Sequence, residues 1–123
     1  MSAYLVNKAV VTRFITALFG RFSGEHVSSL VTDDFRAHAS PTLLRDTFRQ
    51  PRVIVQDLLA QGDRVAARYL FQAEYVGEVD GVDVSGQRIE IPGMMIARMR
   101  GERIAECWWE EDRLAMLAQL RAA

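Results

Sequence analysis

The sequence has little of what marks several classes of protein. Its 123 residues include one cysteine, Cys107, which excludes an internal disulfide framework. The 15 basic and 16 acidic residues leave a formal net charge of -1 and form no basic stripe, so we expect no nucleic-acid partner. No apolar run approaches the roughly 20 residues that a membrane-spanning helix needs. No signal-peptide pattern is present either, so we expect a cytoplasmic protein with no membrane partner.

Half of the residues are hydrophobic, which is enough to build one core in a chain of this length. The sequence shows no repeat, linker or low-complexity tract, so we predict one domain over residues 1–123. Apolar residues recur at helical spacing from Ala3 to Phe22 and include Val10 and Phe14, whereas Asn7 falls outside this stripe. This spacing predicts a long amphipathic helix.

Two shorter helices are predicted between this helix and the first strand. One begins after Ser23 and ends at residues 32–34, and the other runs from Pro41 to the residue before Pro51. On this interpretation residues 35–38 lie in the loop between the two helices.

After Pro51 the hydrophobic period changes to two, which is typical of strands. The clearest alternation covers residues 65–75 and places Tyr69, Phe71 and Tyr75 on one apolar and aromatic face. Further strands are predicted over residues 53–59, 88–91, 94–99 and 103–109, with a break at Pro92-Gly93.

Asp112 is a candidate N-cap for a closing helix that would bury Leu114, Leu117 and Leu120. Helices followed by a run of antiparallel strands and a terminal helix make an α+β domain. A sheet of this length with glycine and proline breaks is free to curl around the first helix.

Several short motifs lie between Asp57 and Leu120: Gly62-Asp63-Arg64-Val65-Ala66-Ala67-Arg68, Tyr75-Val76-Gly77, Arg103-Ile104-Ala105-Glu106, Trp108, Asp112 and Gln119-Leu120. Together they resemble the SnoaL-like polyketide cyclases of the nuclear transport factor 2-like superfamily. Asp34-Phe35 and His38 are similar to the part of that family at the mouth of its pocket. The resemblance implies a cone-shaped, curved antiparallel sheet wrapped around N-terminal helices, a cystatin-like α+β barrel with an apolar cavity.

The acid–base residues of this family do not carry over to the sequence. The position of the family's catalytic aspartate falls on Trp109, and that of an assisting histidine falls on Met95. Neither side chain exchanges a proton, and positioned acid–base catalysis is worth about 10²- to 10⁴-fold in rate. The arginine and aspartate of the related epoxide hydrolases fall on Tyr69 and Phe71. Neither usual mechanism is therefore expected here.

Three titratable residues remain as candidates for catalysis. His38, near the predicted mouth, has a side chain whose pKa near neutrality suits a general base, although a surface loop histidine would look the same. Glu111 shares strand parity with Trp109 and would lean over the cavity mouth, and Asp112 follows it. The alternative for both acids is structural, because acids at a helix N-terminus cap the helix and favour its dipole.

Eight residues are predicted to line the cavity and bind substrate: Phe14, Phe35, Tyr69, Phe71, Tyr75, Met95, Cys107 and Trp109. The alternative is that they fill a solid core, as aromatic stripes usually do. Buried tyrosine and tryptophan need hydrogen-bond partners, however, which favours a cavity with a few polar groups. Cys107 is more readily an apolar filler than a nucleophile.

The opposite face of the sheet mixes charged residues with Trp108. A large aromatic ringed by polar groups is typical of an interface anchor. Because many members of the family that this chain resembles are dimers, we expect a homodimer through the outer sheet face. The alternative is that Trp108 packs beneath the last helix. No cofactor is expected and no metal, since His26 has no partner at metal-ligand spacing.

The resemblance favours a biosynthetic cyclase or isomerase that binds an apolar small molecule and promotes ring closure or rearrangement. Orientation alone is worth about 7–11 kcal/mol in favourable cases, and Tyr69, Tyr75 and Trp109 would supply it. Two alternatives stay open: a non-catalytic ligand-binding or accessory protein of the same fold, and an epoxide hydrolase or hydratase.

Overall fold

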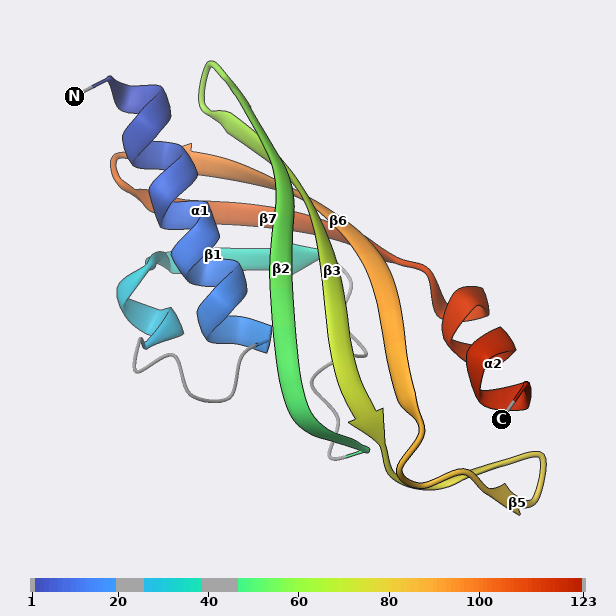
Figure 1. The fold of residues 1–123 in the computed structure, drawn as a ribbon. Coiled ribbons are helices and arrows are strands. Elements are labelled where there is room, and N and C mark those ends of the chain that lie inside the picture. Colours follow the sequence, from blue (N-terminus) through green and yellow to red (C-terminus); the bar gives the residue numbers. More distant parts are fainter. Residues whose placement is uncertain (1, 20–25, 39–46, 123) are drawn as a thin grey trace.

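The computed structural model describes residues 2–19, 26–38 and 47–122. A long helix, α1 (Ala3–Phe19), lies against one face of a five-stranded sheet, and a short helix, α2 (Arg113–Arg121), follows the last strand (Figure 1). The first predicted helix is confirmed as far as Phe19, and its last predicted turn lies outside the described residues.

The sheet has the strand order β1-β7-β6-β3-β2. Its strands are β1 (Val31–His38), β2 (Phe48–Gln61), β3 (Arg64–Tyr75), β6 (Arg88–Arg100) and β7 (Arg103–Glu111). Neighbouring strands are antiparallel except β1, which runs parallel to β7. A small hairpin of β4 (Glu78–Val79) and β5 (Val82–Asp83) extends from the β3–β6 connection. The α+β fold class is therefore confirmed, with a sheet that is mixed because of β1.

The long strands bend around α1. Register shifts interrupt the pairing of β2 with β3, and another interrupts the β6–β7 pairing between Arg98 and Met99. Such bulges bend a strand and increase its twist. The sheet therefore curls with its concave face toward the helix, as predicted (Figure 1).

The buried face of α1 is wider than the helical spacing predicts. Val10 and Phe14 are buried as expected, but Val11, Ile15 and the polar Asn7 are buried too. The helix contacts β2, β3 and β7 at once. A concave sheet that touches a helix from several sides covers more of its circumference than a single flat contact would.

The prediction is wrong for residues 30–38. Among the described residues of this predicted helix, Val27–Ser29 forms a 3-10 turn, η1, and β1 replaces both the predicted helix end and the predicted loop that holds His38. Asp34 in this strand accepts a hydrogen bond from Thr32 at 2.8 Å and pairs with Arg100 of β6. Asp34, one of the residues that suggested a helix end, is thus stabilised by Arg100, a partner distant in the sequence.

The second short helix is wrong at its predicted end. Phe48 begins β2, and Pro51 lies inside that strand. Residues 41–46 of this predicted helix lie outside the described residues. Gln50 has a positive φ of 50° beside the register shift that precedes Arg52, so the proline is accommodated at an irregular place in an edge strand.

The predicted strand break at Pro92-Gly93 does not occur, because β6 continues through both residues. The carbonyl of Pro92 accepts a hydrogen bond from the Asp112 N–H at 2.9 Å. The backbone polar groups of Pro92 therefore point toward the β7 side of β6. Regular pairing with β7 ends at Gly93. Proline has no backbone N–H, and no β7 residue lies opposite Pro92. The proline therefore costs the sheet no hydrogen bond between β6 and β7.

The closing helix is confirmed, with Asp112 as its N-cap, but its buried face differs from the prediction. Leu120 is buried, whereas Leu114 is 79% exposed. The carboxamide of Gln119 accepts a hydrogen bond from the Glu90 N–H and donates one to the Glu90 carbonyl, both at 2.7 Å. The helix thus lies against the edge of β6 beyond the end of β7, and only its inner side is covered.

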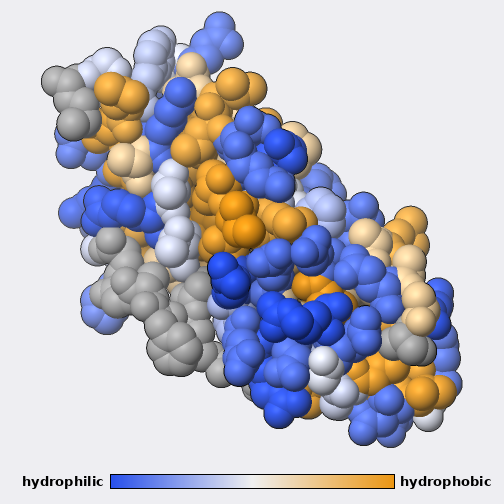
Figure 2. Space-filling model, viewed as in Figure 1, coloured by the Kyte–Doolittle hydropathy of each residue, from blue (hydrophilic) through white to orange (hydrophobic). Residues whose placement is uncertain are grey.

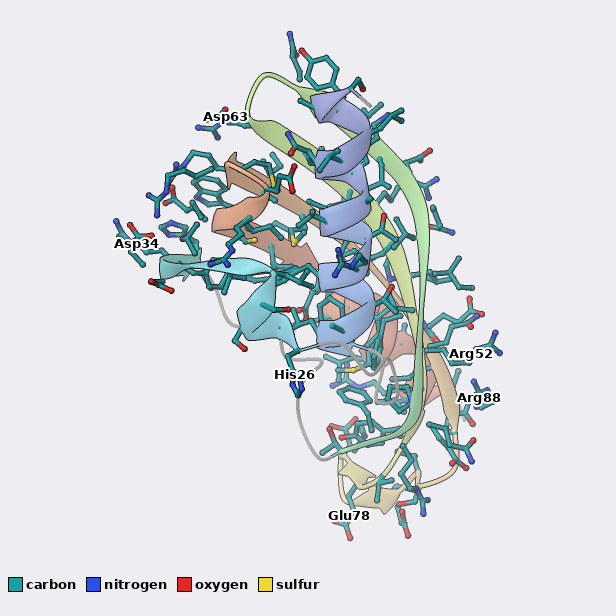
Figure 3. All side chains as sticks on the ribbon, turned by 90° about the vertical axis from the view of Figure 1, so that its left-hand side faces the viewer. His26, Asp34, Arg52, Asp63, Glu78 and Arg88 are labelled. Atoms are coloured by element: carbon teal, nitrogen blue, oxygen red, sulfur yellow. The ribbon has the colours of Figure 1, made fainter. Side chains whose placement is uncertain are left out.

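The surface of the molecule carries both polar and hydrophobic side chains. Figure 2 shows hydrophobic residues near the middle of one face with hydrophilic residues around them. His26 is exposed and points away from the body of the protein, as the labelled charged side chains do (Figure 3). Within the described part of the chain, neither helix is long and apolar enough to cross a bilayer.

Candidate functional site

Tyr69, Gly93 and Glu111 form one row across the concave face of the sheet. Tyr69 on β3 pairs with Gly93 on β6, and Gly93 pairs with Glu111 on β7. Directly opposite residues of antiparallel strands project from the same face of the sheet. Tyr69 is fully buried, so this row faces α1 and the interior.

Trp109 lies in the adjacent row, where it pairs with Met95 on β6. It is 5% exposed, and its ring stacks on Phe14 of α1 with centroids 6.1 Å apart. The ring of Tyr69 stacks on Phe19 of the same helix at 5.1 Å. The helix therefore fixes both polar aromatic side chains from above the sheet.

Both side chains carry a buried donor that nothing in the described structure satisfies. Tyr69 Oη and Trp109 Nε1 have no hydrogen-bond partner there. An unsatisfied buried polar group costs about 1–3 kcal/mol, so such groups call for an explanation. Burial, and then the charge of Glu111, raises the pKa of Tyr69 far above its usual value. The Tyr69 hydroxyl therefore stays protonated and available as a donor.

Apolar side chains surround these donors. Phe14, Phe71, Met95 and Cys107 are all at most 1% exposed. The rings of Phe35 and Phe14 pack edge to face, with centroids 6.0 Å apart. Burial, with a smaller effect of Glu106, raises the pKa of the Cys107 thiol to about 12. The thiol is thus protonated at neutral pH, which suits an apolar filler rather than a nucleophile.

Tyr75 does not join the other two polar aromatics. It lies six residues from Tyr69 along β3, about 20 Å in an extended strand. Its ring packs edge to face with Phe48, at 6.1 Å between centroids. The structure thus places Tyr69 and Trp109 in adjacent rows of the concave face and Tyr75 farther along β3.

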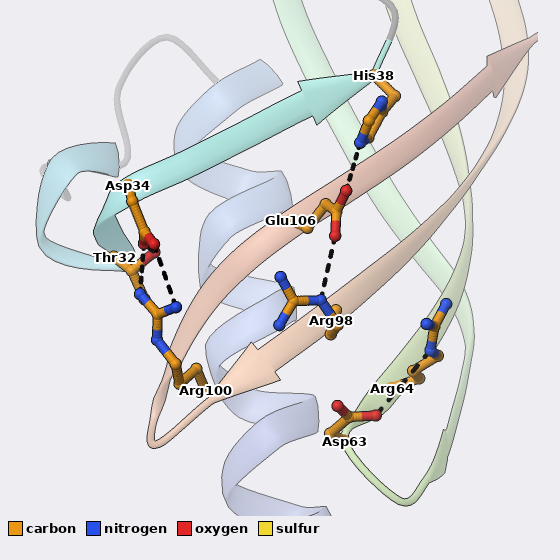
Figure 4. Close-up of polar contacts among 8 residues, drawn as sticks. All are labelled: Thr32, Asp34, His38, Asp63, Arg64, Arg98, Arg100 and Glu106. Carbon is orange, nitrogen blue, oxygen red and sulfur yellow. Dashed lines mark hydrogen bonds and ion pairs between the residues drawn. The ribbon is translucent and has the colours of Figure 1, made fainter.

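His38 lies on the outer face of the sheet, away from α1. Its ring stacks on Trp108, its partner across β1 and β7, with centroids 5.1 Å apart and planes at 5°. His38 Nε2 donates to Glu106 Oε2 at 2.5 Å, and Arg98 Nε donates to Glu106 Oε1 at 3.1 Å (Figure 4). These hydrogen bonds, His38 first, lower the pKa of Glu106. The sheet separates His38 from the two buried donors.

The two acids at the end of β7 have different places. Asp112 Oδ1 accepts a hydrogen bond from the Ala115 N–H at 2.9 Å and so caps α2. Glu111 points to the concave side, close enough for its charge to affect Tyr69. Of the three predicted catalytic residues, only Glu111 therefore lies beside the buried donors.

Sequence reasoning missed Gly93, which it interpreted as a strand break. A glycine inside a strand can instead mark a place where another group approaches the backbone closely. An ideal Cβ built on Gly93 would lie 2.5 Å from two ring carbons of Tyr69. The alternation over residues 88–99 on both sides of Gly93 was a signal for one continuous strand.

The curved sheet wrapped around a helix is shared with several solved structures. AclR from Streptomyces galilaeus, provisionally described as a hydroxylase, has a TM-score of 0.79 at 20% identity, covering 98% of this chain and 99% of that chain. TsrD from Streptomyces laurentii has a TM-score of 0.76 at 22% identity, covering 100% and 99%. A protein from Acidithiobacillus ferrooxidans, provisionally described as a polyketide cyclase, has a TM-score of 0.79 at 23% identity, covering 100% and 99%. These likenesses define the fold.

The sequence gives the family. Residues 9–120 match the family model described as SnoaL-like polyketide cyclase. The chain therefore belongs to the SnoaL-like polyketide cyclase family, and the predicted resemblance is confirmed. A comparison with curated proteins gives no significant match.

Proposed function

We propose that this protein is a small-molecule cyclase or isomerase that binds an apolar, carbonyl-bearing substrate against the concave face of the sheet. The observation that carries the proposal is the pair of unpaired donors, Tyr69 Oη and Trp109 Nε1, in adjacent buried rows. A mostly apolar site with a few polar groups is the usual design for binding a small molecule. Membership of the cyclase family supports the same class of reaction.

The proposed roles follow from the chemistry of the three side chains. Glu111 takes a proton from the carbon next to a substrate carbonyl, and the electron pair moves to the carbonyl oxygen to give an enolate. Tyr69 and Trp109 donate hydrogen bonds to that oxygen, where preorganised donors are most effective. The nucleophilic carbon attacks a second carbonyl of the same molecule, and Glu111 returns the proton to the new alkoxide. If the enolate is conjugated with a double bond, return of the proton to a different carbon shifts that double bond and gives an isomerisation instead.

The first step can be tested without the natural substrate. The probe is 1-tetralone, an apolar bicyclic ketone, and NMR in D2O follows the loss of its α-proton signal. We expect the protein to accelerate exchange and Glu111→Gln to slow it by about 10²- to 10⁴-fold. The matched control is Glu110→Gln, because Glu110 is exposed and has the opposite strand parity.

Two results would contradict this assignment. Equal exchange rates in Glu111→Gln and the parent protein would remove Glu111 as the base. Saturable binding of 1-tetralone without any exchange would favour the alternative, a ligand-binding protein of the same fold.

We also propose that the outer sheet face forms a homodimer. Met94 and Ile96 are 57% and 44% exposed there, and with Trp108 they border a hollow of about 440 Å³. The guanidinium of Arg64 lies over the Trp108 ring at 5.2 Å, and Glu110 lines the same hollow. A surface that is apolar at its centre and carries both charges at its rim complements its own copy across a twofold axis.

Light scattering coupled to size-exclusion chromatography tests the dimer. Ile96→Glu places a charge at the centre of the patch, so we expect it to shift the protein from dimer to monomer at micromolar concentration. Leu114→Glu is the control, since this leucine is equally apolar and more exposed but lies on α2. A parent protein that is monomeric throughout, or an Ile96→Glu variant that stays dimeric, would contradict the proposal.

A further inference from the structure

Gly93 differs from the other glycines that the structure describes. The others all have positive φ angles: Gly62, Gly77, Gly81, Gly86 and Gly101. Glycine adopts such angles without steric cost because it has no Cβ. Gly93 has no such angle; it lies within the regular pairing of β6 with β3 and forms the last regular pair with β7. Its backbone would suit any residue, so the reason for glycine lies in the space above it.

That space is occupied by the ring of Tyr69. A Cβ on Gly93 would lie 2.5 Å from Cε2 and Cζ of Tyr69 and 2.6 Å from its hydroxyl oxygen. Contacts this short do not occur at real Cβ atoms, and the ring cannot move upward freely because Phe19 stacks on it at 5.1 Å. Any side chain at Gly93 would therefore displace the ring.

The missing side chain also decides where the hydroxyl lies. Tyr69 starts on β3, yet its hydroxyl oxygen lies over β6, one strand spacing of about 4.8 Å from β7. Glu111 occupies the next place in the same row. The charge of Glu111 contributes to the raised pKa of Tyr69, which agrees with this proximity.

We propose that Gly93 is a positioning residue, whose lack of a side chain lets Tyr69 reach across β6 and present its hydroxyl beside Glu111. The inference rests on the proposed function for its catalytic consequence, but the placement of the ring is a separate claim. A misplacement of about 1 Å can cost about 10²-fold in rate. Gly93→Ala should therefore impair the site without touching any group that exchanges a proton.

The test reads the position of the Tyr69 hydroxyl directly. The sequence has three tyrosines, and Tyr4→Phe with Tyr75→Phe leaves Tyr69 alone to give a tyrosinate absorbance signal. In this background we expect Tyr69 to resist ionisation until the protein unfolds in alkali. After Gly93→Ala we expect it to ionise in the folded protein near the ordinary pKa of about 10, and 1-tetralone exchange to fall by about 10²-fold.

A control separates displacement from simple loss of stability. Leu120→Ala removes a buried side chain from α2, and we expect it to lower the pH at which the protein unfolds in alkali. Tyr69 should still stay protonated as long as the protein is folded, and the exchange rate should be unchanged. An unchanged Tyr69 titration in Gly93→Ala would overturn the inference. So would a shifted titration with undiminished exchange.

The outcome for Gly93 is distinguishable from that for the proposed function. If the background protein exchanges no α-proton of 1-tetralone, the proposed function fails while the titration still decides the position of Tyr69. If Gly93→Ala does not fold, the same substitution is made together with Tyr69→Leu. We then expect the double variant to be as stable as Tyr69→Leu alone. If Gly93→Ala destabilises the protein equally with Tyr69 present and with Tyr69→Leu, the inference is overturned.

Discussion

Replacing Tyr69 by phenylalanine is expected to make the protein more stable and less active. The hydroxyl is buried without a partner, so its removal should raise the free energy of unfolding by about 1–3 kcal/mol. The ring contacts with Phe19 and Gly93 remain. Loss of one donor to the enolate oxygen should slow α-proton exchange of 1-tetralone by about 10²- to 10³-fold. Urea denaturation and NMR measure the two effects.

Tyr75→Phe makes the same chemical change at the far end of β3. Tyr75 is only partly buried and its hydroxyl is not among the unpaired buried groups, so we expect neither effect. A Tyr69→Phe variant that is less stable than the parent and equally active would show that the hydroxyl serves the fold and not a ligand.

Trp109→Ala is expected to have the largest effect on stability. The side chain is 5% exposed and its ring stacks on Phe14, and a buried tryptophan replaced by alanine typically costs about 3–5 kcal/mol. That is a large share of the roughly 5–15 kcal/mol by which domains are stable. Thermal and urea unfolding monitored by circular dichroism measure the loss. Alanine at this position therefore cannot report on catalysis alone.

Trp109→Phe is the informative companion to this variant. It keeps an aromatic ring beside Phe14 and removes the indole N–H. We expect a much smaller loss of stability and a fall in exchange rate comparable to that of Tyr69→Phe, since each removes one donor. Exchange at the parent rate in a folded Trp109→Phe variant would exclude the indole N–H from the site.

The interior faces of the strands were predictable from the sequence. Strict alternation over residues 65–75 fixes which side of β3 is buried, because a strand has a period of two. The same parity correctly places Met95, Cys107 and Trp109 on the concave face. Which of these residues meet could not be predicted, because it depends on the register between β3, β6 and β7. That register puts Trp109 in the row next to that of Tyr69 and leaves Tyr75 distant.

The position of His38 shows the limit of local reasoning most clearly. The Thr-Asp-Asp sequence of residues 32–34 suggested a helix end, and a loop was expected to bring His38 to the pocket. Instead β1 pairs in parallel with β7, so that His38 meets Glu106, a residue 68 positions later in the sequence. Parallel pairing over such a separation leaves no local pattern to read. The same holds for Gly93, whose role appears only when Tyr69 lies across it.

The hydrogen bonds of Gln119 to Glu90 have a consequence for how the protein behaves at high concentration. Where β7 stops, β6 would offer bare N–H and C=O groups to any passing chain, and open strand edges are templates for aggregation. The carboxamide of Gln119 meets both groups of Glu90, as a neighbouring strand would. We therefore expect the last helix, through Gln119, to protect this edge of β6 from pairing with a strand of another molecule.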